Sequence, residues 1–168
     1  MRFQAIIPFA FLSMGSGISV AIGQPVARTI FDQLPAVAVH VVGLNPAIDS
    51  VGVDSGPLRV ALETRLQEEG IAILEADQLL ATPDVARLVV QVGGFSVDSA
   101  FIYTVTLELL EPVRLERSGL KVLGYGWSKL VAGVAERSEV RAAVEDAVDR
   151  LAGLFLDGRR LALAVAVR

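Results

Sequence analysis

The stretch from Ala100 to Leu115, AFIYTVTLELLEPVRL, is the longest unbroken strand pattern in the chain. Its alternate residues form two sets that differ in chemistry. The odd-numbered residues are mostly apolar or aromatic, and the even-numbered residues are more polar and include two threonines and Glu108. A period of two with β-branched and aromatic residues indicates a strand with one buried face. We therefore predict that this stretch is the central strand of a sheet on which two helices pack.

Composition limits the classes of protein to which the chain can belong. Its 168 residues suit a single domain, and an apolar fraction of 53% supplies enough material for a core. A net charge of −4 and a pI near 5.0 do not indicate a nucleic-acid-binding protein, which normally carries a basic patch. Cysteine is absent, so a disulfide framework, a thiol nucleophile, a cysteine-ligated metal and the usual acylated lipoprotein anchor are excluded.

Residues 1–23 have the pattern of a secretory signal peptide. Arg2 supplies a positive charge, residues 5–14 are mostly apolar, and the small residues of Ala21-Ile22-Gly23 predict cleavage before Gln24. Arg2 is the one charged residue removed, so the mature chain would carry 14 basic and 19 acidic residues, a net charge of −5. The alternatives are a retained membrane anchor or a structural N-terminal helix. We expect a periplasmic or secreted protein with no stable membrane anchor after cleavage.

The remaining chain reads as a flexible lead-in over 24–35 and one domain over 36–168. Strand patterns occur at 36–44, 71–74, 87–91 (as far as 95), 100–115 and 120–131, a loop is predicted at 132–135, and amphipathic helices begin near Ser55 and Ser138. Short connections between the last strands favour antiparallel pairing. We predict an α+β fold, a two-layer sandwich with two helices on one face of a mostly antiparallel four- or five-stranded sheet.

Both helices are predicted from apolar stripes at steps of three and four. The first has Ser55 as its N-cap and ends at Gly70, a left-handed residue that lets Ile71 pack on Leu66. The second runs to about Asp157, and the tail after it fits either a helix extension or a last strand. The stripes are Leu58, Ala61, Leu62 and Leu66 in the first helix, and Val140, Val144, Ala147, Leu151, Leu154 and Phe155 in the second.

Glycine and proline mark irregular points of the predicted sheet. Gly93-Gly94 predicts a bulge or the exit of a strand, and Pro112, which lacks a ladder donor, predicts an edge or a bulge. In the strand at 120–131, small residues at 124, 126 and 128 lie opposite an aromatic parity, so the small side packs closely or is open to a partner. Tyr103, Tyr125 and Trp127 are predicted to be core residues.

No catalytic, cofactor-binding or metal-binding residue is predicted. The single histidine, His40, lies in a valine-rich strand, where a structural role is expected, and the hydrolase, zinc-protease and P-loop motifs are missing. The acids are predicted to lie on solvated faces or in loops whose spacing fits no calcium site. They are Glu68-Glu69, Glu145-Asp146, Asp149, Asp49, Asp54 and Asp98, whereas Glu108 and Glu111 cannot be placed from sequence.

Four basic residues gather around the predicted hairpin of the last two strands: Arg114, Arg117, Lys121 and Lys129. Charged residues at a sheet edge discourage the addition of further strands, and we favour that role. Contact with an anion or a lipid headgroup is the alternative.

The layout over 36–157 resembles small bacterial envelope proteins. Its helix–turn–strand segment ETRLQEEGIAIL and its long strand YTVTLELLEPVRL sit in an architecture similar to the amino-terminal domain of the Tol–Pal translocation protein and to the lipopolysaccharide-assembly lipoprotein. The resemblance is one of architecture, and the lipobox cysteine of the lipoprotein members is missing. It implies a protein of the cell envelope and carries over no functional residue.

Three functions are compatible with this sequence. The first is a non-enzymatic exported protein that binds another envelope component, for example through an exposed sheet edge. The second is a small-molecule or lipid-binding protein with an apolar pocket behind Phe101, Tyr103 and Leu151. The third is an enzyme with His40 in a cleft beside a carboxylate. We favour the first, with no cofactor and no nucleic-acid partner.

Overall fold

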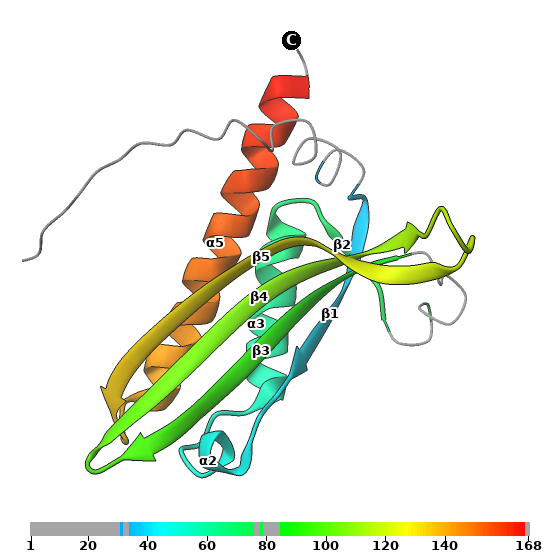
Figure 1. Ribbon diagram of the computed structural model, residues 1–168. Coiled ribbons are helices and arrows are strands. Elements are labelled where there is room, and N and C mark those ends of the chain that lie inside the picture. The colour runs from blue at the N-terminus through cyan, green and yellow to red at the C-terminus, as the bar shows by residue number, and fades with distance from the viewer. Residues whose placement is uncertain (1–30, 32–33, 76–77, 79–84, 167–168) are drawn as a thin grey trace, which may run out of the picture.

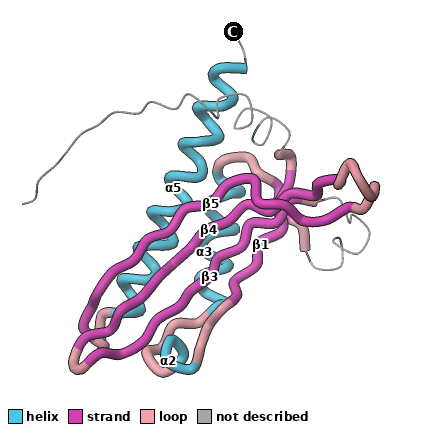
Figure 2. The backbone as a smooth tube through the Cα atoms, in the orientation of Figure 1, coloured by secondary structure: helices cyan, strands magenta, loops and turns pink. Residues whose placement is uncertain are grey.

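A five-stranded sheet with helices on one face forms the body of the computed structural model, which describes residues 31, 34–75, 78 and 85–166 (Figure 1). The strands lie in the order β2-β1-β3-β4-β5. Helices α3 and α5 lie side by side behind the sheet, and no described helix covers its other face (Figure 2). The elements are β1 (Ala36–Val42), α2 (Pro46–Asp49), α3 (Ser55–Glu68), β2 (Ala72–Ile73), β3 (Ala86–Val97), β4 (Ala100–Arg114), β5 (Lys121–Glu136) and α5 (Val140–Ala166).

The strand directions confirm the predicted fold class. β3, β4 and β5 are successive antiparallel neighbours, whereas β1 runs parallel to both β2 and β3, so the sheet is mixed. The prediction that the stretch at 100–115 is the central strand is wrong by one place. β3 holds the centre, because the parallel pair of β1 and β2 extends the sheet on its far side.

The alternation in β4 sets the core. Phe101, Val105 and Leu109 have no exposed surface, while the residues between them are partly exposed. Leu62 of α3 and Leu151 of α5 pack into the same cluster. Burying an aliphatic or aromatic side chain of this size contributes roughly 1.5–3 kcal/mol, so this one row of contacts holds the two layers together.

The predicted ending of the first helix is confirmed. Gly70 has φ +75°, its N–H donates to the Gln67 carbonyl, and the Ile71 N–H donates to the Leu66 carbonyl at 3.0 Å. These are the two hydrogen bonds of a Schellman ending, and both Leu66 and Ile71 are buried.

The start of the same helix differs from the prediction. The N-cap is Asp54, one residue before Ser55, and its carboxylate accepts the Gly56 N–H at 2.9 Å. Ala61, predicted to face inward, is exposed, because it lies beside a shallow pocket between α3 and α5.

The last strand and the last helix are both longer than predicted. Residues 132–135, predicted as a loop, continue β5, since each pairs with β4 in regular register. Helix α5 passes through Gly158 and continues to Ala166, which settles the tail as a helix extension. Leu154 is 47% exposed, so it lies outside the buried stripe to which we assigned it.

Two side chains of the predicted lead-in pack into the core. Phe31 and Leu34 are buried, and the Phe31 ring lies edge-on to Phe155 with a centroid distance of 5.5 Å. The predicted signal peptide and residues 24–30 and 32–33 of the lead-in lie outside the described residues.

The irregular points of the sheet are not where the glycines predicted them. Gly93 and Gly94 pair regularly with Thr104 and Tyr103. The absence of a side chain at Gly94 serves packing instead, because a Cβ there would lie 2.4 Å from the Phe101 ring.

The bulge lies in β5. Leu109 pairs with Trp127 and Leu110 with Tyr125, so Gly126 is an extra residue on that strand. The expectation for Pro112 is confirmed. β4 pairs with β3 only as far as Leu110, so Pro112 needs no ladder bond on that side.

Candidate interaction surface

The outer edge of β5 is a 16-residue strand edge to which no described strand is hydrogen-bonded. An unpaired edge presents a row of N–H and C=O groups to any extended chain that approaches it. Lys129 on this strand is exposed and discourages close approach at its middle. From Leu130 to Glu136 no lysine or arginine occurs, so this half of the edge is the more accessible one.

Beside this edge, the uncovered face carries apolar side chains that we name the open patch: Phe95, Ile102, Leu130 and Val134. Phe95 pairs with Ile102, which pairs with Val134, so three neighbouring strands contribute one row. Phe95 is 56% exposed, Leu130 60% and Val134 67%. Single exposed apolar residues are ordinary, but a contiguous row on a sheet face is typical of an interaction site.

The chemistry of the uncovered face changes along the strands. Towards its middle, Gln91 donates to Glu108 at 3.0 Å, and Thr104 and Thr106 face the same way. At the end near the turn between β3 and β4, Phe95, Ile102 and Val134 replace these polar groups, whereas Leu130 lies beside Thr106. Sequence analysis did not single out Phe95, Leu130 or Val134. The sequence does show apolar residues at these positions of β3 and β5, on the side of each strand that faces away from the helices.

Tyr103, Tyr125 and Trp127, all predicted to be core residues, divide between the two faces of the sheet. Tyr103 is buried over Gly133, where a Cβ would meet the tyrosine oxygen at 2.4 Å. Trp127 packs partly buried against the core, with its ring centroid 5.4 Å from that of Phe155. The core assignment of Tyr125 is wrong, because this side chain is 74% exposed. The bulge at Gly126 turns Tyr125 to the face opposite Trp127.

The basic residues of the hairpin, Arg114, Arg117, Lys121 and Lys129, are all exposed. The first three belong to the end of the β4–β5 hairpin that extends past the body of the sheet (Figure 1). Lys129 lies further along β5, beside the body. The structure therefore separates one member of the predicted cluster from the other three.

His40 lies on β1, on the same face as its pairing partner Val89. Burial lowers the pKa of His40, and the nearby cations Arg87 and Arg59 lower it further. Its Nε2 atom is buried and has no hydrogen-bond partner in the described part of the chain. Among the described residues, the charged groups that act on this imidazole are two guanidinium groups, and neighbouring cations do not activate a histidine as a general base.

Several acidic residues form ion pairs at the surface. Glu69 pairs with Arg160 and Asp149 with Arg65, which join the α3 segment to α5, whereas Glu145 pairs with Arg141 within α5. Surface pairs of this kind contribute about 0–1 kcal/mol each, so the first two align α3 and α5 only weakly. Among the described residues, no group of three or more acids or histidines is placed to hold a metal ion. Burial raises the pKa of Glu111, which stands near the base of the hairpin.

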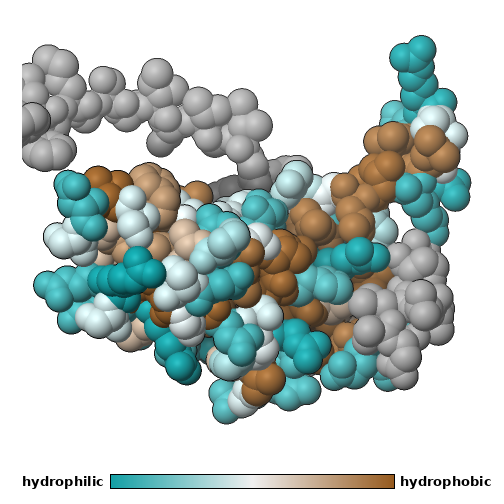
Figure 3. Space-filling model, turned by 90° about the horizontal axis from the view of Figure 1, so that it is seen from below, coloured by the Kyte–Doolittle hydropathy of each residue, from teal (hydrophilic) through white to brown (hydrophobic). Residues whose placement is uncertain are grey.

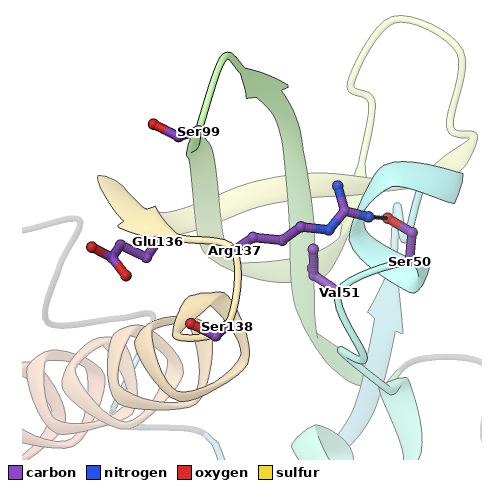
Figure 4. Close-up of a pocket in the computed structure, with 6 residues that line it drawn as sticks. All are labelled: Ser50, Val51, Ser99, Glu136, Arg137 and Ser138. Atoms are coloured by element: carbon purple, nitrogen blue, oxygen red, sulfur yellow. Dashed lines mark hydrogen bonds between the residues drawn. The ribbon is translucent and has the colours of Figure 1, made fainter.

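A polar hollow lies where the turn of β3 and β4, the end of α2 and the junction of β5 and α5 meet (Figure 4). Arg137 donates to the Ser50 hydroxyl at 2.9 Å, while Glu136 points the other way. The polar side chains that line this hollow point in different directions, and among them no nucleophile is hydrogen-bonded to a base.

The side chains proposed to line a pocket between sheet and helices are packed against their neighbours. Phe101 and Leu151 have no exposed surface, and Tyr103 is 7% exposed. The hollow between α3 and α5 is lined instead by residues such as Leu58, Val148 and Ala152. A ligand pocket behind Phe101 stays a prediction without support from these side chains.

No protein-family model and no curated protein matches this chain. Three solved structures share a broadly similar arrangement. A minor lipoprotein from Acinetobacter baumannii is 11% identical, with 74% of this chain and 89% of that one aligned and a TM-score of 0.41. A PelC dodecamer from Paraburkholderia phytofirmans is 15% identical, with 68% and 83% aligned and a TM-score of 0.42.

The third structure is the lipoprotein GNA1162 from Neisseria meningitidis, at 13% identity, 70% and 98% coverage and a TM-score of 0.35. These values are too low to transfer a role, and the resemblance to the Tol–Pal protein and the lipopolysaccharide-assembly lipoprotein stays a prediction. Within the described ranges, no helix is long and apolar enough to cross a membrane.

Proposed function

We propose that the chain is a non-enzymatic protein of the cell envelope that binds another envelope protein along the edge of β5. The observation that carries the proposal is the coincidence of an unpaired edge with an exposed apolar row, since Leu130 and Val134 belong to both. An extended segment added there gains backbone hydrogen bonds from the edge and apolar contacts from the open patch.

The residues beside this edge support binding rather than chemistry. The exposed side chains of the open patch are hydrocarbon, so they offer apolar contacts and no titratable group. The signal pattern at 1–23 supports export, and an exported chain would present the binding surface in the periplasm or outside the cell.

The experiment is affinity copurification of the tagged protein from native cell envelopes, with the intact mass recorded on the same sample. We expect a mass corresponding to a chain that begins at Gln24 and a partner in a fixed ratio. A full-length mass would contradict export.

Two matched variants locate the contact. Leu130→Glu with Val134→Glu should release the partner, whereas Leu154→Glu with Leu161→Glu, on exposed positions of α5, should retain it. Slower amide hydrogen exchange over 130–136 in the complex would identify strand addition, because edge N–H groups become hydrogen-bonded. Equal retention by both variants would overturn the proposal.

A further inference from the structure

The end of the β4–β5 hairpin is a two-stranded ribbon that leaves the body of the protein. β4 loses its pairing with β3 after Leu110, and among the described residues only β4 and β5 pair beyond that point, as far as the turn, where the Leu115 N–H donates to the Leu120 carbonyl. Figure 3 shows this ribbon standing out from the body, hydrophobic along its stem and hydrophilic at its end. We name residues 113–123 the hairpin tip.

One face of the hairpin tip is apolar, and the opposite face is apolar at its base. Val113 pairs with Val122, and both are 40% exposed. Leu115 and Leu120 follow on the same face, with exposed fractions of 45% and 63%. On the other parity, Leu123 and the neighbouring Tyr125 are 40% and 74% exposed. Arg114 and Lys121 lie on the opposite face of the tip, so the ribbon has one side suited to acyl chains and one side suited to headgroups.

The charge of the hairpin tip opposes that of the whole protein. It carries Arg114, Arg117 and Lys121 against one carboxylate, Glu116, a net charge of +2, while the full chain has −4. Arg114 and Lys121 are cross-strand neighbours, so two cations lie on one side of the ribbon. Basic residues bordering exposed apolar ones are typical of segments that bind anionic membrane surfaces.

We propose that the hairpin tip inserts into the surface of a bilayer that contains anionic phospholipids. Leu115, Leu120 and the two valines enter the boundary of the acyl chains, and the cations remain among the headgroups. This contact differs from the proposed partner site, because the open patch lies at the opposite end of β4 and β5.

The test is vesicle flotation of the full chain as it is isolated from the envelope. Vesicles of equal parts phosphatidylglycerol and phosphatidylethanolamine should carry the protein, and pure phosphatidylcholine vesicles should carry much less. Leu115→Ser with Leu120→Ser should abolish the binding. Arg114→Gln with Lys121→Gln should weaken binding to the anionic vesicles by roughly fivefold per cation, with little change on phosphatidylcholine.

Leu130→Ser with Val134→Ser is the matched control and should float like the wild type, since it alters the open patch alone. It also separates this inference from the proposed function, because these two residues belong to the partner site. Failure of the wild type to float, or equal flotation of the Leu115/Leu120 variant, would overturn the inference.

A second readout reports insertion directly. The chain contains no cysteine, so Leu120→Cys gives one attachment point for an environment-sensitive fluorophore. Anionic vesicles should shift its emission to the blue, and the same label at Leu161→Cys, on an exposed position of α5, should not shift. An unshifted emission at position 120 would contradict insertion.

Discussion

The two faces of β3 and β4 share one backbone and yet have opposite environments. On the covered face, Phe101 and Leu88 have no exposed surface, because α3 and α5 lie against them. On the uncovered face, Phe95 is 56% exposed. The residue before it, Gly94, faces the other way and lies against the Phe101 ring. Burial here depends on which side received the helices, and side-chain chemistry alone does not decide it.

The largest expected difference is between two phenylalanines. Phe101→Ala removes a fully buried ring and should lower the free energy of unfolding by about 3–5 kcal/mol, whereas Phe95→Ala should change it by no more than about 0.5 kcal/mol. Urea denaturation of both variants measures the contrast. Similar losses for the two variants would mean that the uncovered face is packed in solution.

Two adjacent glycines sharpen the same contrast. Gly94→Ala places a Cβ 2.4 Å from the Phe101 ring and 2.8 Å from the Ile102 carbonyl oxygen, so it should cost about 1–3 kcal/mol. Gly93→Ala meets only the Thr104 hydroxyl, at 3.2 Å, which rotates away, and should change stability by less than about 1 kcal/mol. Thermal unfolding compares them, and an equal loss would contradict the geometry.

His40, on the uncovered face of β1, should make the free energy of unfolding depend on pH. Its pKa is lowered in the folded state by burial and by Arg87 and Arg59, so between that lowered pKa and the ordinary value of 6.5 the unfolded chain binds more protons. The contribution of His40 is therefore complete above pH 6.5 and is lost as the pH falls through the folded pKa. His40→Gln should flatten the stability curve there, and an unchanged slope would show that other groups produce it.

The smallest expected effect lies in the polar middle of the uncovered face. Gln91 donates to Glu108 across two strands in an exposed setting. A double-mutant cycle with Gln91→Ala and Glu108→Ala should give a coupling of about 0.2–1 kcal/mol. A larger coupling would indicate that this part of the face is shielded from water.

Local chemistry predicted those parts of the fold that depend on a few neighbouring residues. The strand at 100–114 followed from alternation, and the end of α3 followed from Gly70 between two apolar contacts. The lengths of β5 and α5 were missed because AGVA and LALAVAVR suit several conformations. Long-range pairing with β4, and continuation of the helix, decide between them.

The candidate surfaces were predicted less well than the fold. The basic residues of the hairpin were visible in the sequence, but their position beyond the last β3 contact was not. The open patch required knowledge of which face the helices leave uncovered. Tyr125 was assigned to the wrong face because counting by twos assumes an uninterrupted register, and Gly126 interrupts it.

That interruption has a consequence for how such a protein can change over time. Gly126 is extra only on β5, so Tyr125 stays paired with Leu110 and lies on the face opposite Trp127. Loss of Gly126 would make Tyr125 and Trp127 consecutive and would keep both of these pairings, so the two sides of the protruding ribbon would be retained. The extra residue can therefore be gained or lost in evolution without reversing the ribbon.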